Sequence, residues 1–239
     1  MTGALELRTA SVTLTGGDRA FRLEIDALDL VPGQAVALTG ASGSGKTLLL
    51  EVLGLLRAPG PGTVMRRGGD DLAALWAGGA RNPALAARRG ALFGFVPQTG
   101  GLVPFLTLAE NIALPQRVTG RADPDHVAGL MDRLGLADVA GLYPSALSIG
   151  QRQRGAIARA LAHRPPFVIA DEPTAALDPD SADGVLSLLL EMAREGGSGV
   201  ILSSHDLARI ARFELPQITL TAETRGQTVT ARLTEPVPC

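Results

Sequence analysis

The sequence predicts an α/β fold, in which buried strands alternate with helices, together with a small antiparallel β subdomain near the N-terminus. Two short apolar runs, residues 35–39 and 167–170, predict buried strands, and polar residues suited to phosphate or metal chemistry follow each of them directly. Hydrophobic and polar residues alternate between residues 5 and 25, which predicts the antiparallel part. With 239 residues, 46% of them hydrophobic, the chain is long enough for one domain with a sizeable core.

The composition restricts the classes of partner. The formal net charge is −2, so no excess of basic residues indicates a nucleic-acid partner. The single cysteine, Cys239, excludes a disulfide within the chain. No apolar run approaches the roughly 18 residues that a membrane-spanning helix needs. If the function involves a membrane, we expect another chain to supply the span.

The first strands are predicted by the alternation of Phe21, Leu23 and Ile25 with polar residues, and 16–18 (Gly-Gly-Asp) predict the turn between two such strands. The buried strand at 35–39 leads into the segment GASGSGKT, which matches the phosphate-loop pattern GxxxxGK[ST] at every fixed position. Glycines let backbone N–H groups turn toward phosphate oxygens, and the helix that follows adds its positive end. The predicted phosphate contacts are Gly40, Ala41, Ser42, Gly43, Ser44, Gly45, Lys46, Thr47 and Leu48.

Within this loop, Lys46 is expected to bind the β- and γ-phosphates, and the hydroxyl of Thr47 to bind magnesium. Lys46 is the only lysine of the chain. The helix after the loop is predicted to stop near Pro59, and Arg88-Arg89 to form a charged surface turn.

The apolar run 92–96 predicts another buried strand, which ends at Pro97-Gln98. The pattern is then mainly helical to Leu161, with Asp123 as a helix N-cap. His126 and His163 follow no strand and are expected to be surface or capping residues.

The strand at 167–170 carries Asp171 to its carboxyl end, where it can hold magnesium through water, and Glu172 can then orient or deprotonate an attacking water. A further core strand, 199–204, ends at His205. The ends of such strands meet at the ligand-binding edge of an α/β sheet. A hairpin is predicted for the tail, with strands at 218–220 and 229–233.

Taken together, these motifs resemble the ATP-binding subunits of ABC transporters, over residues 5–213. The loop at 40–47 is similar to the Walker A motif, the segment ending in Asp171-Glu172 to Walker B, and LSIGQ at 147–151 to the family signature. Residues 94–115 resemble the lipoprotein-release and macrolide-export type. The resemblance implies a P-loop NTPase with a RecA-like core sheet, and Mg²⁺ held by Thr47, Gln98 and Asp171. It also implies catalysis by Glu172, His205 and Gln98, and ATP contacts from Ser148, Gly150 and Gln151.

The resemblance implies a single domain over residues 1–239: an ATP-binding core with its β subdomain at 1–98 and 156–239, and a helical signature subdomain at 99–155. Three positions depart from the family pattern. Ile149 replaces a glycine of the signature, and Leu48 replaces a hydroxyl residue after Thr47. Leu14 stands where the family stacks adenine on an aromatic residue, so weaker base recognition is expected.

The family relation implies an ATP-hydrolysing subunit that dimerises around two ATP molecules and drives a separate integral membrane permease, of the export or mechanical-transduction type. Its expected place is peripheral, at the cytoplasmic face of the inner membrane, paired with a second copy of itself or a homologous ATPase subunit. Cargo, transport direction and the permease stay open.

Three alternatives stay open. One is a soluble ABC ATPase of DNA repair or the ribosome, although the interval between Lys46 and Asp171 lacks a heptad repeat and the chain carries one such domain. Another is a weakly active partner subunit of a heterodimer. The third is a kinase-like enzyme acting on a small substrate, but no motif beyond the loop supports it.

Overall fold

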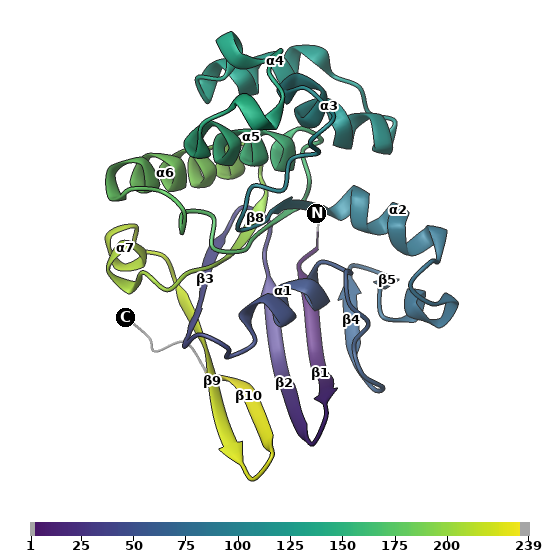
Figure 1. Ribbon diagram of the computed structural model, residues 1–239. Coiled ribbons are helices and arrows are strands. Elements are labelled where there is room, and N and C mark those ends of the chain that lie inside the picture. The colour runs from purple at the N-terminus through teal and green to yellow at the C-terminus, as the bar shows by residue number, and fades with distance from the viewer. Residues whose placement is uncertain (1–2, 235–239) are drawn as a thin grey trace. The chain divides into compact units, whose positions relative to one another are not determined.

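The computed structural model describes residues 3–234, so Cys239 lies outside the described part. Contacts divide the chain into two compact units, Met1–Arg89 with Ser203–Cys239 and Gly90–Leu202. The predicted helical segment 99–155 falls within the second unit, and the predicted domain division itself stays a prediction. The elements along the chain (Figure 1) are β1 Leu5–Gly16, β2 Arg19–Leu30, β3 Ala35–Gly40, α1 Lys46–Leu53, β4 Val64–Arg67, β5 Asp70–Asp71, η1 Ala74–Gly78, α2 Pro83–Leu92, β6 Phe93–Val96, α3 Leu108–Thr119, α4 Pro124–Arg133, η2 Ala137–Val139, η3 Pro144–Ala146, α5 Ile149–Leu161, β7 Phe167–Ala170, α6 Pro179–Glu195, β8 Gly199–Ser203, α7 Leu207–Arg212, β9 Gln217–Arg225 and β10 Thr228–Thr234.

The first unit is built on strands in the order β5-β4-β1-β2-β10-β9-β3. β1 and β2 form the predicted antiparallel pair, with Leu5 opposite Leu30 and Gly16 opposite Arg19. The predicted tail hairpin is also present: β9 and β10 pair antiparallel, and β10 runs parallel to β2. β3, which leads into the phosphate loop, runs parallel to β9. The phosphate loop therefore follows directly after β3, a strand that is hydrogen-bonded within the sheet.

The second unit has a parallel core in which β7 lies between β6 and β8. Tilted aromatic rings pack in it, with the centroid of Phe93 6.0 Å from that of Phe167. Helix α5 approaches β6 closely, because a Cβ at Gly94 would lie 2.1 Å from the carbonyl oxygen of Ala160. Helices α3, α4 and α5 contact one another (Figure 1). This packing fixes α5, whose first turn carries the signature residues.

Three expectations about the elements are wrong in detail. Helix α1 ends at Leu53 rather than near Pro59, because Gly54 caps it and Leu55 adopts a φ of 56° with its side chain fully buried. The predicted surface turn at Arg88-Arg89 lies instead within α2, which starts at Pro83. His163 is only 7% exposed, so it is a buried residue rather than a surface or capping residue.

Asp123 is the N-cap of α4, as predicted, and its side chain accepts a hydrogen bond from the backbone N–H of His126. A second contact, with the guanidinium of Arg164 at 2.7 Å, ties this cap to the chain after α5. The N–H bond and the Arg164 contact lower the pKa of Asp123. The start of α4 is thus held in place by a carboxylate that stays charged.

Candidate nucleotide-binding site

The phosphate loop of the first unit has the backbone that its glycines predict. Gly40, Gly43 and Gly45 have φ values of 143°, 75° and 96°, a region that favours glycine. At Gly40 a Cβ would lie 2.5 Å from the carbonyl oxygen of Leu220, so a side chain does not fit there. Gly45 is the N-cap of α1, and no side chain caps that helix end. The positive N-terminal end of α1, where helix termini commonly bind anions, therefore has no side-chain cap.

The ammonium group of Lys46 lies over the loop that precedes it. Its Nζ donates to the carbonyl oxygens of Gly40, at 2.9 Å, and Ala41, at 3.2 Å. It also lies 3.3 Å from Nε2 of His205, the residue two positions after β8. The side chain of Lys46 is buried, with 6% exposed. The loop thus holds a single, positioned positive charge at its centre.

The other predicted loop residues divide into exposed and buried ones. Ala41, Ser42 and Thr47 are exposed. Leu48 is buried. Because leucine has no polar side-chain group, only its backbone N–H can donate to a phosphate. Ser44 is 1% exposed, and its Oγ has no hydrogen-bond partner among the described residues.

In the second unit, the ends of β6 and β7 bring together residues predicted separately. Val96 pairs with Ala170 in the parallel ladder, and the backbone N–H of Asp171 donates to the carbonyl oxygen of Val96 at 2.9 Å. Gln98 is exposed two residues beyond β6, while Asp171 and Glu172 are half-exposed directly after β7. As predicted, these side chains arise at one edge of the parallel core.

Glu172 has an unusual backbone. Its φ is 46°, in the left-handed region that a non-glycine residue rarely adopts, and its carbonyl oxygen accepts a hydrogen bond from the N–H of Ala175 at 3.1 Å. Such a conformation costs about 1–3 kcal/mol and persists where the surrounding structure imposes it, often at functional sites. The turn after β7 therefore sets the direction of the Glu172 side chain.

The signature residues form the start of α5. Ser148 is the N-cap and makes a capping box: its Oγ accepts from the N–H of Gln151 at 3.2 Å, and its own N–H donates to Oε1 of Gln151 at 2.8 Å. Gly150 lies between them in the first turn. Ile149 is 52% exposed, so the branched side chain that replaces glycine does not disturb the helix core.

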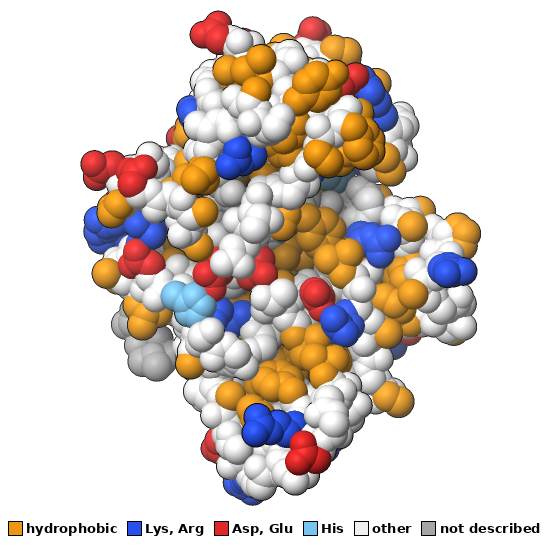
Figure 2. All heavy atoms as spheres, viewed as in Figure 1, with side chains coloured by type: hydrophobic (Ala, Val, Ile, Leu, Met, Phe, Trp, Pro, Cys, Tyr) orange, Lys and Arg blue, Asp and Glu red, His pale blue; other side chains and the backbone are white. Residues whose placement is uncertain are grey.

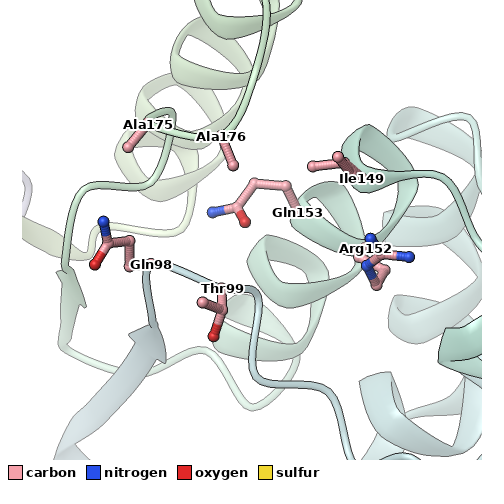
Figure 3. A pocket seen from close by; sticks show the side chains of 7 residues that line it. All are labelled: Gln98, Thr99, Ile149, Arg152, Gln153, Ala175 and Ala176. Carbon is pink, nitrogen blue, oxygen red and sulfur yellow. The ribbon is translucent and has the colours of Figure 1, made fainter.

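A pocket of about 420 Å³ lies beside this helix start, lined by Gln98, Thr99, Ile149, Arg152, Gln153, Ala175 and Ala176. Figure 3 shows the side chain of Gln153 extending into it from α5, toward the segment that holds Gln98. Gln153 is 4% exposed, and its Nε2 has no hydrogen-bond partner among the described residues. The pocket thus joins the residue after β6, the signature helix and the segment after Glu172 in one place.

Sequence reasoning missed the residue that shapes the segment after Gln98. Asn111 in α3 is fully buried; its Oδ1 accepts from the N–H of Val103 at 2.7 Å. Its Nδ2 donates to the carbonyl oxygens of Val103, Leu106 and Thr107 at 3.0–3.1 Å. Arg159 of α5 adds bonds to the carbonyl oxygens at 100 and 101. The available signal was an asparagine next to Ile112 on the helix face that also carries buried Leu108 and Gln116.

The residues present suit a nucleotide with a magnesium ion. In the first unit, the loop offers backbone N–H groups and Lys46 for phosphates, and Thr47 offers an oxygen donor; in the second unit, Gln98 and Asp171 carry oxygen donors of the kind that Mg²⁺ prefers. Among the described residues, no group of three or more His, Cys, Asp or Glu side chains could hold a metal by itself. Mg²⁺ is commonly held by one or two carboxylates together with phosphate oxygens and water, and one ion shared by Thr47, Gln98 and Asp171 stays a prediction.

The chain is similar to known ATP-binding proteins of transporters. A family model described as ABC transporter matches residues 23–175. The chain is 40% identical to the lipoprotein-releasing system ATP-binding protein LolD 1 of Caulobacter vibrioides, over 89% of this chain and 90% of that protein. It is 38% identical to the macrolide export ATP-binding/permease protein MacB of Shigella flexneri, over 90% of this chain but 33% of that protein.

A solved structure confirms the predicted fold. A dimeric post-hydrolysis state of the ATP-binding cassette MJ0796, bound to ADP and Pi, has a TM-score of 0.79 with 31% sequence identity, covering 90% of this chain and 93% of that chain. The α/β P-loop NTPase fold predicted from the sequence is therefore correct. In the part of the chain that the structure describes, no helix is long and apolar enough to span a membrane.

Proposed function

The chain belongs to the ABC transporter family as an ATP-binding subunit, and from this premise we propose that it hydrolyses ATP in a dimer and thereby drives a separate membrane permease. The observation that carries the proposal is the position of Lys46. Its buried ammonium, held by two loop carbonyls, supplies a fixed positive charge beside the N-terminal end of α1, which no side chain caps. This arrangement favours a triphosphate over a ligand without charge.

We propose that Lys46 binds the β- and γ-phosphates and that Thr47 contributes its hydroxyl to Mg²⁺. The ion, when bound, neutralises charge on the phosphate oxygens. Asp171 would hold it through water, and Gln98 would provide a further oxygen. Because Leu48 has no hydroxyl, only its backbone N–H contributes to the phosphate site, and this costs about 1 kcal/mol of binding free energy.

Glu172 is the proposed general base. It orients a water molecule and accepts a proton from it as the water oxygen bonds to the γ-phosphorus and the bond to the β-phosphate oxygen breaks. The left-handed backbone at Glu172 supports this role, because such conformations cluster at functional sites and this one sets the direction in which the side chain leaves the backbone. His205 responds to the γ-phosphate through its contact with Lys46.

A second copy of the chain, or a homologous subunit, is proposed to complete each site. The N-terminal end of α5 carries a partial positive charge, and Ser148, Gly150 and Gln151 present it at the surface. One chain already holds the γ-phosphate with Lys46, so this second helix end is most useful across an interface. ATP then joins the two copies, and hydrolysis releases them.

The permease is proposed to dock on the helical segment near residues 99–120. In this segment Phe105 is 76% exposed and Val118 is 73% exposed. Large apolar side chains that are exposed together often mark a surface that binds a partner. Asn111 and Arg159 hold the backbone of this segment rigid, as a surface that transmits force requires. The names of the relatives LolD 1 and MacB favour an export or mechanical-transduction type, with the chain peripheral at the cytoplasmic face of the membrane.

A pull-down tests the proposed partnership. The Glu172→Gln variant is tagged, expressed in its native host and purified from gently solubilised membranes with ATP present. We expect a permease with few spans and a large extracytoplasmic domain to co-purify. Lys46→Ala, processed in parallel, is the matched control and should retain less of any partner that requires the ATP-bound state.

The other outcomes of the pull-down are equally informative. Recovery of a permease with many spans and a binding-protein partner would indicate import rather than export. A second ATPase subunit in equal amount would show a heterodimer. Recovery of soluble proteins or nucleic acid alone would contradict the transporter proposal.

A further inference from the structure

The base of the nucleotide lacks an aromatic partner at the position where the family provides one, because that position is Leu14. The register of the first two strands shows what lies beside it. Leu14 of β1 pairs directly with Phe21 of β2, and Phe21 pairs with Val229 of β10 on its other side. Side chains of directly paired residues point to the same face of a sheet. Leu14, Phe21 and Val229 therefore form an apolar row across three adjacent strands, here called the apolar shelf.

The apolar shelf lies next to the phosphate loop. A Cβ at Gly45 would lie 2.8 Å from Cζ and 3.0 Å from Cε1 of Phe21, so the edge of the ring rests on the backbone of Gly45. Gly45 directly precedes Lys46 and caps α1. The aromatic ring thus borders the backbone groups that are proposed to bind phosphate.

The apolar shelf is also accessible. Leu14 is 39% exposed, and Phe21 and Val229 are half-buried, whereas Leu23, the next residue of β2 on the same face, is 1% exposed. Figure 2 shows an apolar surface over β1 and β2. The two other aromatic residues of the first unit lie elsewhere: Trp76 in η1 and Phe213 at the C-terminal end of α7. Phe21 is the aromatic side chain that borders the loop.

We propose that Phe21 is the base-contacting aromatic residue of this chain and that the apolar shelf is the platform on which the nucleoside lies. This inference rests on the proposed function, because it assumes that the loop binds a nucleoside triphosphate. Ribose and base follow the α-phosphate, so they leave the loop at its border. A ring there can stack on a base, and Leu14 and Val229 extend the apolar surface on either side of it.

Stacking on a phenyl ring predicts a specific pattern of affinities. The aromatic face recognises the π-surface of the base and not its hydrogen-bonding edge, so ATP and GTP should depend on Phe21 to a similar extent. Tripolyphosphate has the same charged chain but no base, so its affinity should not depend on Phe21. This separates a contact with the nucleoside from an indirect effect on the loop.

The test is a set of titrations of the purified full chain with ATP, GTP and tripolyphosphate, each with Mg²⁺, followed by calorimetry. Phe21→Ala should weaken ATP and GTP by about 10-fold and leave tripolyphosphate within about 2-fold. Phe21→Tyr should restore the affinity for ATP. Val31→Ala, which shortens an exposed side chain outside the apolar shelf, is the matched control and should change none of the three.

Two results would overturn the inference: Phe21→Ala binding ATP as tightly as the wild type, or the same weakening of ATP and tripolyphosphate, since the ring would then only shape the loop. If Phe21→Ala does not fold, Phe21→Leu in the same titrations keeps the comparison, with the same expectations. Failure of the proposed function would give a different result in the same titrations. The folded wild-type chain would then bind neither ATP nor tripolyphosphate.

Discussion

Nε2 of His205 lies 3.3 Å from the ammonium nitrogen of Lys46. A lysine ammonium only donates hydrogen bonds, so in a hydrogen bond between the two groups Nε2 is the acceptor. The contact connects the residue proposed to respond to the γ-phosphate with the residue proposed to bind it. A γ-phosphate that attracts the ammonium would therefore also change the surroundings of the histidine ring.

This relationship predicts how substitutions of His205 behave. His205→Ala removes the acceptor and should lower the ATPase kcat by about 100-fold, with the KM for ATP changed by less than about 3-fold. His205→Gln retains an acceptor oxygen and should keep more activity than His205→Ala. Steady-state kinetics of both variants test this. Equal activity of wild type and His205→Ala would contradict the assigned role.

Lys46 makes the strongest prediction about affinity. Lys46→Ala removes the only charged group shown within the loop and should weaken ATP binding by about 10- to 100-fold, the loss expected for hydrogen bonds to a charged partner. Calorimetric titration with ATP measures it. Arg57→Ala, which removes an exposed ion pair with Glu51, is the control and should bind like the wild type. Unchanged affinity of Lys46→Ala would refute its role.

Asn111 should contribute more to the free energy of unfolding than an asparagine that is only half-buried. Asn111→Ala removes the acceptor of the Val103 N–H and the donor to three carbonyl oxygens, all at a fully buried position. The free energy of unfolding, from urea denaturation, should fall by about 2–3 kcal/mol. Asn82→Ala is the matched control, because half-buried Asn82 makes two comparable bonds. A loss no greater than that of the control would show that the segment is not held by Asn111.

The buried His163 predicts a dependence of stability on pH. Burial lowers its pKa from the ordinary value of 6.5, and the charge of Arg121 acts in the same direction, while the backbone of Phe93 opposes it. As the pH falls through 6.5, His163 is therefore protonated in the unfolded chain before it is protonated in the folded chain. The contribution of His163 is fully present above pH 6.5 and is lost as the pH falls below this value toward the lowered pKa.

The free energies of unfolding at pH 7.5 and pH 5.5 test this expectation. The wild type should be less stable at pH 5.5, and His163→Gln should reduce the difference. His126 also has a lowered pKa, chiefly through burial, so His126→Gln separates the two residues. If His163→Gln had the same pH dependence as the wild type, another group would have to cause it.

The sequence was sufficient where the signal is local. The phosphate loop, the turn at Gly17 and the cap at Asp123 all follow from the residues themselves, because glycine and short polar side chains determine the backbone at those points. The hairpin β9–β10 and the strand before Asp171 follow from the apolar pattern in the same way.

The sequence was insufficient where a residue depends on its tertiary surroundings. Helix α1 ends early because Gly54 caps it and the side chain of Leu55 is buried with a left-handed backbone. Gly54 was a possible stop signal, but the apolar pattern continues to Leu56, so the sequence favours the prolines from Pro59 onward as the stop. Asn82 and Pro83 do carry a helix-start signal for α2, since Oδ1 of Asn82 accepts from the N–H of Ala84, but Arg88-Arg89 alone suggested a turn. The burial of His163 has no local signal.

For the site, the sequence identified the candidate residues but not which other residues, distant in the sequence, lie beside them. Phe21 was expected only as one residue of an alternating strand, because its place beside Gly45 depends on the register of β1 with β2. The pocket around Gln153 joins segments far apart in the chain. Such juxtapositions depend on packing and cannot be derived from spacing.

The most direct test of the central claim is the oligomeric state of Glu172→Gln with ATP. The substitution retains the shape of the side chain but removes the base, so hydrolysis should slow by roughly 10²–10⁴-fold. Sedimentation measured with and without saturating ATP and Mg²⁺ should show monomers converting to a stable dimer, and Ser148→Arg added to the same chain should prevent it. A variant that demonstrably binds ATP and remains monomeric would contradict a dimer joined by ATP.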